Sequence, residues 1–336
     1  MRWPTWSWKA LIGVGVSLLS LSVPARAERV AVMMDWILNG KHSPFFAGVK
    51  QGFYKAEGLD AEILGGKGSG NTVKEVGAGK IDYGFADASA LIVGRAQGLH
   101  TKLLSVIHDK SPHAIFSLRK NGLKKPTDFR GKKFGGFEAD VVRIIFPAFA
   151  QANGFQGSDV EWISMPPAAK VPSLLSGRVD AITNFVTDAP AIVASGQKVN
   201  LEISIMRMAD HGVDLYSNGL LAADGRVQTN KDQAGRFVRA SMKAWAWAVE
   251  HPKETIDIFS AQTPTLARAI AEKQLAVAID LLLSDHSKTY GIGHIDEEKM
   301  RKTIEVLAKY MKLPRTPSTS EVYTNQFLPK LIPRQR

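Results

Sequence analysis

The sequence contains no cysteine among its 336 residues. This absence excludes disulfide bonds, thiolate metal sites, iron–sulfur clusters and thiol nucleophiles in one step. It also excludes the lipid-modified cysteine that tethers many exported bacterial proteins to a membrane. We therefore expect the mature protein to diffuse freely.

The sequence also lacks a long apolar run. Its strongly apolar stretch, Ala10–Val23, has about 14 residues, fewer than the roughly 20 that a membrane-spanning helix needs. Positive charges at Arg2 and Lys9 precede this stretch, and the small-x-small sequence ARA follows it. This order is typical of a signal peptide over residues 1–27 and predicts export to the periplasm with cleavage near Ala27. A retained anchor helix is the alternative.

A continuous basic stripe is absent too, although the formal net charge is +11. The lysines and arginines are dispersed, and stretches such as KEVGAGK mix them with glutamate. Proteins that bind nucleic acid usually gather basic residues on one face. The sequence therefore indicates a basic soluble protein with no nucleic-acid partner.

Catalytic and metal-site motifs are also scarce. No two of the eight histidines are four residues apart, the spacing of a helical zinc motif. No G-x-S-x-G turn is present, and the glycine-rich Gly65–Asn71 lacks the spacing of a Walker loop or a dinucleotide fingerprint. That segment is either a flexible turn or a contact to a polar group of a ligand. We expect no catalytic residue, no metal and no cofactor.

The sequence does contain an alternation of strand-like and helix-like segments. The predicted strands of a first series are RVAVMM, LDAEIL and IDYGFAD, and the helical stretches between and after them are FFAGVKQGFYKAEG, GNTVKEVGAG and ASALIVGRAQG. The alternation starts again near Gly131 with the strands GKKFGGF, VEWISM and VDAITNF. This order predicts an α/β fold. From Thr229 onward the chain is predicted to be mostly helical.

The two series contain a weak internal match. Gly79–Asp82 (GKID) corresponds to Gly177–Asp180 (GRVD), and in both places a predicted helix precedes and a predicted strand follows. The match favours two similar lobes, with chance similarity as the alternative. Because ligands bind beyond the carboxyl ends of the strands in open α/β sheets, two facing lobes would enclose a cleft.

Polar and aromatic residues gather in the loops that follow predicted strands. Taken singly, Asp, Asn, Ser and Gly are most often turn formers, and only their shared position at strand ends favours a binding site. A stacking Trp or Tyr with converging carboxylates and amides suits a flat, hydrogen-bonding heterocycle. The loops are Asp35–His42, Gly68–Asn71, Ala86–Ser89, Phe137–Asp140, Asn184–Asp188 and Asp210–Gly219.

The order of these motifs resembles a known family. The stretches DWILNGKHSPFFAGVKQGFYKAEGLDAEI, VKEVGAGKIDYGFAD, LLSGRVDAITNF and DHGVDLYSNGLLA resemble the thiamine-pyrimidine precursor-binding (pyrimidine synthase-like) family of periplasmic substrate-binding proteins. This family lies within the wider sulfonate- and nitrate-binding group. The resemblance implies a type II periplasmic binding protein fold, in which two α/β lobes close on a ligand by hinge motion and deliver it to an ABC importer.

The resemblance also implies a division of the chain. Residues 28–114 and 220–336 would form a discontinuous first lobe with the C-terminal helices, and residues 115–219 would form the second lobe. Crossing strands are expected near Ser111–Leu118 and Tyr216–Ala222. We expect a monomer whose partners are a small-molecule ligand and the membrane permease of the importer.

The family's first loop often reads D-W-x-P-N-T-N-H, whereas this sequence reads DWILNGKH. The departures at Leu38 and Gly40-Lys41 indicate an altered ligand choice. Together with the strand-end loops, the resemblance implies the following candidate ligand-binding residues: Asp35, Trp36, Asn39, His42, Gly68, Ser69, Asn71, Asp87, Glu138, Asn184, Asp188, Asp214 and Tyr216.

The sequence leaves three functions open. The favoured one is a solute-binding protein for a heterocycle similar to a thiamine pyrimidine precursor; a riboflavin-like molecule, a sulfonate or an aromatic acid are alternative ligands. The second is a pyrimidine-synthase-like enzyme. The resemblance implies pyridoxal phosphate, iron, a cysteine-rich run and a His matching His42 for such enzymes, and the missing cysteine and the export signal argue against it. The third is a binding module for a sensor or chaperone partner.

Overall fold

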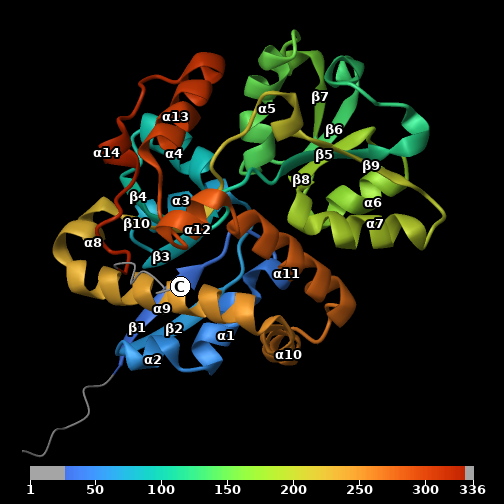
Figure 1. Cartoon of the computed structure of the whole chain (residues 1–336). Coiled ribbons are helices and arrows are strands. Elements are labelled where there is room, and N and C mark those ends of the chain that lie inside the picture. The colour runs from blue at the N-terminus through green and yellow to red at the C-terminus, as the bar shows by residue number, and fades with distance from the viewer. Residues whose placement is uncertain (1–26, 330–336) are drawn as a thin grey trace, which may run out of the picture.

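The computed structural model describes residues 27–329 and consists of two lobes, each built on a five-stranded sheet (Figure 1). The predicted signal peptide, apart from Ala27, lies outside the described residues. Helices pack against both sheets, so the predicted α/β fold with two lobes is confirmed.

The first sheet has the strand order β2-β1-β3-β10-β4. Strands β2, β1 and β3 are parallel, and β10 is antiparallel to both of its neighbours. The central β3 is buried along its whole length, as expected for a strand covered on both faces. The strands are β1 (Glu28–Met33), β2 (Leu59–Leu64), β3 (Tyr83–Asp87), β4 (Thr101–Val106) and β10 (Asn218–Ala223).

The second sheet repeats this arrangement with the order β7-β6-β8-β5-β9. Strands β7, β6 and β8 are parallel, and β5 is antiparallel to both of its neighbours. The strands are β5 (His113–Leu118), β6 (Lys133–Gly136), β7 (Glu161–Ser164), β8 (Ala181–Phe185) and β9 (Ile203–Arg207).

Helices surround the two sheets, and most of the C-terminal ones lie on the first lobe (Figure 1). The predicted helix that begins at Phe45 is two helices, because Gly52 between them has a positive φ of 74° that glycine tolerates. The helices are α1 (Ser43–Lys50), α2 (Phe53–Ala56), α3 (Ser69–Gly77), α4 (Ala88–Ala96), α5 (Val141–Ala152), α6 (Lys170–Leu175), α7 (Ala189–Gln197), α8 (Asp224–Thr229), α9 (Lys231–Glu250), α10 (Pro252–Gln262), α11 (Arg268–Leu282), α12 (Asp285–Tyr290), α13 (Glu297–Met311) and α14 (Thr319–Val322).

Helix α9 supplies the centre of the first lobe's core. Phe237, Met242 and Trp245 are buried, as their helical spacing predicts. Trp245 lies edge-on to Phe45 with ring centroids 6.0 Å apart. Trp247 is half-buried and stacks on a histidine at the end of the same helix, so it belongs to helix packing.

The weak internal match corresponds to the same structural unit in both lobes. Gly79 and Gly177 have positive φ angles of 72° and 73° and end the preceding helices. Asp82 Oδ2 then accepts a hydrogen bond of 2.8 Å from a backbone N–H of β1, and Asp180 Oδ2 accepts one of 2.8 Å from β6. Each aspartate thus joins the start of one parallel strand to its neighbour.

The chain passes between the sheets over residues 107–112 and 208–217. The predicted lobe boundaries, at 114/115 and 219/220, fall inside β5 and β10. Each change of sheet comes a few residues earlier, because β5 already pairs with β8 at its first residue and β10 pairs with β3 at its first residue.

The segment from α12 to α13 braces both crossings from the side of the first lobe. At the first crossing, Ser284 Oγ donates to Asp109 Oδ2 and Lys299 Nζ donates to the Asp109 carbonyl. At the second crossing, the backbone N–H of Asp296 donates to the Tyr216 hydroxyl at 3.0 Å. Both crossings are therefore tied to the C-terminal part of the chain, whose helix α13 packs against α4 of the first lobe and α5 of the second.

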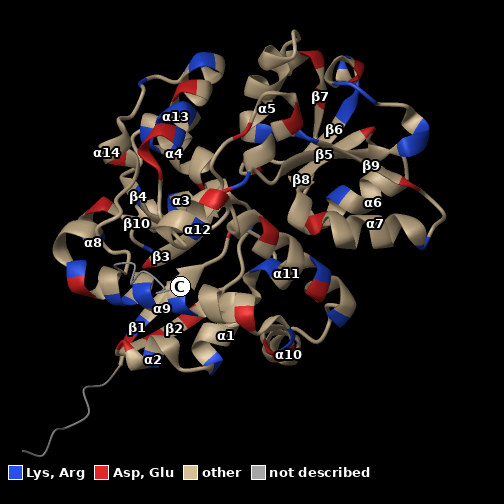
Figure 2. Ribbon diagram, in the orientation of Figure 1, with Lys and Arg blue, Asp and Glu red and all other residues tan. Residues whose placement is uncertain are grey.

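Charged residues of both signs are distributed over the two lobes. Figure 2 shows Lys and Arg interspersed with Asp and Glu along the helices, with the densest group of basic residues on the turn between β5 and β6. Among residues 27–329, no helix is long and apolar enough to cross a membrane.

Candidate ligand-binding site

The loop after β1 directs two basic side chains toward Asp35. It contains the 3-10 turn η1 (Gly40–His42), capped by Asn39, whose Oδ1 accepts a hydrogen bond of 3.1 Å from Lys41 N. Lys41 Nζ donates to Asp35 Oδ2 at 2.7 Å, and His42 Nε2 lies 2.8 Å from Asp35 Oδ1. His42 Nδ1 accepts from Asn39 N at 3.1 Å, so the ring proton is on Nε2 and donates to Asp35.

Gly40 fixes the path of this loop against α11. A Cβ at this position would lie 2.1 Å from the carbonyl oxygen of Ala271. The Gly40 N–H also donates to Gln274 Oε1 at 2.9 Å. Since only glycine fits beside the α11 backbone, the close approach of this helix places Lys41 inside the protein.

Asp35 is a buried carboxylate held in its charged form. Burial alone would raise its pKa, but the Lys41 ammonium and the His42 hydrogen bond outweigh burial and hold the pKa of Asp35 well below its usual range. Burial lowers the pKa of His42 below its ordinary value, although Asp35 opposes this shift. The first lobe therefore presents a neutral imidazole and a Lys41–Asp35 ion pair.

The second lobe carries a matching ion pair. Asp140 is the N-cap of α5, where its Oδ1 accepts from Val142 N at 3.1 Å. Its Oδ2 accepts from Lys170 Nζ at 2.5 Å and from Thr183 Oγ1 at 2.7 Å. Lys170 and Asp140 are both buried. Each lobe thus supplies one buried Lys–Asp pair.

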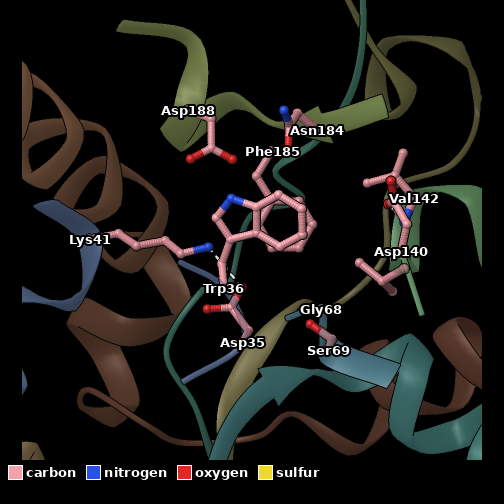
Figure 3. A pocket seen from close by; sticks show the side chains of 11 residues that line it. Asp35, Trp36, Lys41, Gly68, Ser69, Asp140, Val142, Asn184, Phe185 and Asp188 are labelled. Carbon is pink, nitrogen blue, oxygen red and sulfur yellow. Dashed lines mark hydrogen bonds and ion pairs between the residues drawn. The ribbon is translucent and has the colours of Figure 1, made fainter. Parts of the chain in front are cut away.

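A small pocket with a cavity of about 20 Å³ lies between these two groups. Figure 3 shows the Trp36 indole at its centre, with the Asp35 and Asp188 carboxylates on either side of it. Trp36 stacks on Phe137 with ring centroids 5.6 Å apart, and Lys41 Nζ lies 4.7 Å from the centre of the Phe185 ring. The lining residues are Asp35, Trp36, Lys41, Gly68, Ser69, Asp140, Val141, Val142, Asn184, Phe185 and Asp188.

Direct contacts between the lobes close this pocket. Asn39 Nδ2 donates to Asp188 Oδ1 at 2.9 Å, across 149 residues of sequence. The backbone N–H of Gly70 donates to the Ala139 carbonyl at 3.3 Å. Gly68 lies so near this loop that an added Cβ would be 2.6 Å from Ala139 O. The structure is therefore the closed form of the two lobes.

Asp188 differs electrostatically from the other two pocket aspartates. It is only 8% exposed and lies at the end of the 3-10 turn η6 (Val186–Asp188). Burial raises the pKa of the Asp188 carboxyl to about 6, although the neighbouring Lys41 ammonium opposes the rise. Its side-chain hydrogen-bond partner is the neutral Asn39 amide.

The structure brings together many of the residues implied by the sequence. Asn39 and His42 do not line the pocket themselves. They hydrogen-bond to the lining residues Asp188 and Asp35, respectively. The predicted residues that line the pocket are Asp35, Trp36, Gly68, Ser69, Asn184 and Asp188. Their contact with a ligand remains a prediction.

Five further predicted residues, besides Asn39 and His42, lie outside the pocket lining. Glu138 and Asp214 are exposed, and Asn71 is half-buried in the first turn of α3. Asp87 is buried; its backbone N–H donates to Ser69 Oγ at 3.2 Å, and its Oδ2 lies 2.7 Å from His113 Nε2 and accepts from Ser217 Oγ at 2.6 Å. Tyr216 is buried in the second crossing. Of these, Asp87 caps α4 and Tyr216 belongs to the second crossing.

The sequence reasoning missed Lys41, Asp140, Lys170 and Phe185 as site residues. Asp140 had a detectable signal, because it directly precedes the predicted helix VVRII and aspartate is a favoured N-cap. Lys41 stood in the first loop, but nothing in the sequence gave its direction. Lys170 reaches the site from α6 only because the second sheet has folded.

The family described as NMT1/THI5 like matches residues 39–255 of this chain. The riboflavin-binding protein RibY of Chloroflexus aurantiacus is 22% identical over 90% of this chain and 86% of that protein. The formylaminopyrimidine-binding protein of Halalkalibacterium halodurans is 25% identical over 75% and 77%. A 4-amino-5-hydroxymethyl-2-methylpyrimidine phosphate synthase of Legionella pneumophila is 21% identical over 92% and 95%.

Solved structures share the fold. The alkanesulfonate-binding protein SsuA from Xanthomonas axonopodis pv. citri aligns with a TM-score of 0.69 at 13% identity, covering 89% of this chain and 99% of that one. The periplasmic nitrate-binding protein NrtA from Synechocystis PCC 6803 aligns with a TM-score of 0.60 at 15% identity, covering 90% and 87%. At these identities the likeness establishes the periplasmic binding protein fold alone.

Proposed function

Because this chain belongs to the NMT1/THI5-like family of ABC substrate-binding proteins, we propose that it captures a small nitrogen heterocycle, similar to a thiamine pyrimidine precursor, and delivers it to an importer. The observation that carries this proposal is the closed pocket between the lobes, where Trp36 stands among three aspartates. An indole suits stacking on a flat ring, and the carboxylates suit ring amino groups.

The lobes leave little free space for a ligand. The cavity of about 20 Å³ between them is far below the range for small-molecule sites, roughly 300–1,000 Å³, so a bound ligand requires the lobes to move apart, and a single-ring ligand requires the smallest movement. A riboflavin-like molecule has three fused rings and a sugar chain, and would need a wider opening of the lobes. We therefore place 4-amino-5-hydroxymethyl-2-methylpyrimidine ahead of riboflavin as a test ligand.

Binding is tested by titration calorimetry and thermal shift. The panel is 4-amino-5-hydroxymethyl-2-methylpyrimidine, riboflavin, methanesulfonate, nitrate and benzoate, since a ligand that binds only the folded state raises the melting temperature. We expect the aminopyrimidine to bind and to change the intrinsic tryptophan fluorescence. No binding of any heterocycle would contradict the proposal.

The contribution of Trp36 is tested against a matched tryptophan. Trp36→Phe should remove most of the fluorescence change on binding, because this indole would lie against the ligand. Trp247→Phe is the control, since Trp247 packs on α9 away from the pocket. A fluorescence change that is lost only in Trp247→Phe would remove Trp36 from the site.

Delivery to an importer rests on the family and on the predicted signal peptide. We propose that the mature protein is a periplasmic monomer that docks on a membrane permease. Co-purification with the permease from cross-linked cells supports transport, whereas capture of a sensor kinase would assign the same pocket to signalling.

An enzyme of the same fold is the second candidate. The observation that favours it is the likeness to a pyrimidine phosphate synthase over most of both chains, together with the buried Lys41 and the neutral His42 in the first loop. The absence of cysteine from the whole sequence weighs against it. Formation of a pyrimidine phosphate by the purified protein, supplied with pyridoxal phosphate and iron, would replace the binding proposal.

A further inference from the structure

The pocket contains more carboxylates than ammonium groups to pair with them, and this difference indicates the charge of the ligand. We propose that Asp188 is the ion-pair partner of the ligand, and that the site selects basic heterocycles with a protonated ring nitrogen beside an amino group. This inference rests on the proposed function and names its substrate class.

The two other pocket aspartates are already neutralised. Asp35 pairs with Lys41 at 2.7 Å, and Asp140 pairs with Lys170 at 2.5 Å. Within residues 27–329, no Lys, Arg or His forms an ion pair with Asp188. Three carboxylates thus share two ammonium groups, and the uncompensated charge is on Asp188.

Asp188 is placed to meet a ligand. Figure 3 shows its carboxylate directed toward the centre of the pocket, beside the Trp36 indole. Its Oδ1 accepts from the Asn39 amide of the opposite lobe, and the backbone of Phe185 also hydrogen-bonds to it. These donors are neutral, so they orient the carboxylate without cancelling its charge.

The surroundings of Asp188 make a ligand cation favourable. Burial raises the pKa of its carboxyl to about 6; Lys41 and Lys170 oppose this rise, whereas Asp35 adds to it. Helix α11, which packs against η6, presents the neutral Gln274 to the first loop and keeps its charged residues Glu272, Lys273 and Asp280 exposed. A buried carboxylate without a cation is costly, and a cationic ligand would remove that cost.

The preferred ligand geometry follows from the carboxylate. A protonated ring nitrogen and a neighbouring amino group present two parallel N–H donors, which match the two oxygens of one carboxylate as a guanidinium does. An anionic ligand such as a sulfonate would instead face Asp188 without gaining a cation. If the free base is neutral and Asp188 is ionised, binding takes up one proton from solution, and this proton lies between the ring nitrogen and the carboxylate.

The test compares wild-type protein, Asp188→Asn and Asp60→Asn by titration calorimetry at pH 8. Asp60 is exposed on β2, so its variant changes charge equally without touching the pocket. The probes are 4-amino-5-hydroxymethyl-2-methylpyrimidine, its 4-hydroxy analogue, riboflavin and methanesulfonate. We expect the amino compound to bind best, Asp188→Asn to weaken it roughly 10- to 100-fold, as expected for a lost charge-assisted hydrogen bond, and Asp60→Asn to leave it unchanged.

Proton uptake gives a second measurement that needs no variant. Calorimetry in two buffers of different ionisation enthalpy should show proton uptake by the wild-type protein with the amino compound. Equal affinity of Asp188→Asn and wild type, or binding without proton uptake, would overturn the inference while the binding function stands. Binding of riboflavin or methanesulfonate in place of the amino compound also overturns it. No binding of any probe contradicts both proposals.

Discussion

The two walls of the pocket hold the same ion pair in different ways. In the first lobe, Asp35 and Lys41 are six residues apart within one loop, and His42 is a second, titratable partner. In the second lobe, Asp140 and Lys170 are 30 residues apart, and the additional partner is the neutral Thr183 hydroxyl. Both pairs depend on tertiary folding, because α11 fixes the first loop, but only the first pair has a titratable second partner.

The largest expected effect comes from breaking the second pair. Lys170→Met leaves Asp140 buried with only neutral hydrogen-bond donors. Removing one partner of a buried pair typically costs about 3–5 kcal/mol of unfolding free energy, and urea unfolding at pH 8 measures it. If Lys170→Met loses no more unfolding free energy than Lys41→Met, the two ion pairs do not differ in this way.

Lys41→Met should cost less, about 1–3 kcal/mol, and the cost should shrink at low pH. Without Lys41, the folded protein can bind an extra proton at the Asp35–His42 pair. Since the variant's folded state then binds more protons than that of the wild type, its relative stability rises as pH falls. The relief should set in below the ordinary imidazole pKa of about 6.5, because burial still lowers the pKa of His42 in the variant. Unfolding at pH 5.5 and pH 8 checks this; an equal cost at both would rule out His42 as the titratable second partner.

The two copies of the internal match give a smaller comparison. Asp82 accepts from a backbone N–H of β1 and also pairs with Arg226, whereas Asp180 accepts from β6 and forms no ion pair within residues 27–329. Asp180→Ala should cost about 1 kcal/mol, as for a single hydrogen bond, and Asp82→Ala up to about 2–3 kcal/mol. Thermal unfolding of the two variants measures both costs. A larger loss of stability in Asp180→Ala than in Asp82→Ala would contradict this ranking.

The smallest expected effect is that of Asp188→Asn on the ligand-free protein. The pKa of Asp188 is raised to about 6 by burial, so the folded state binds more protons than the unfolded state between about pH 4 and pH 6. Wild-type stability therefore loses this contribution as pH rises through that window. Asp188→Asn should melt about 2–4 °C higher at pH 8, a change of about 1 kcal/mol, and no higher at pH 4. If Asp188→Asn melted higher than the wild type only at pH 4, the ionised Asp188 carboxylate would not be the destabilising form.

The strand and helix pattern of the sequence predicted the fold well because it depends on short-range periodicity. The runs LDAEIL and IDYGFAD contain β2 and β3, and the buried face of α9 follows the spacing of Phe237, Met242 and Trp245. The split of the first helix at Gly52 was missed, since glycine is tolerated within helices and its positive φ depends on context.

The site was predicted less completely, because loop position alone does not give side-chain direction. Trp36 and Asp188 were chosen from strand-end position and the family resemblance, and both line one pocket. Glu138 was chosen over Asp140 in the same loop, and only the N-cap of α5 turns Asp140 inward. The role of Lys41 depends on the approach of α11 to Gly40, which links residues more than 200 positions apart.

The brace on the two crossings determines where the molecule can bend. Asp109 and Tyr216 are fastened to the segment from α12 to α13, so the chain on the first-lobe side of these residues cannot turn freely. We therefore expect opening of the lobes to change backbone angles over residues 110–112 and 208–215, which include Gly212 at a φ of 85°. Opening also has to separate α13 from α5, where Gln151 Nε2 donates to the Tyr310 carbonyl at 3.0 Å, so α13 would register the movement of the second lobe.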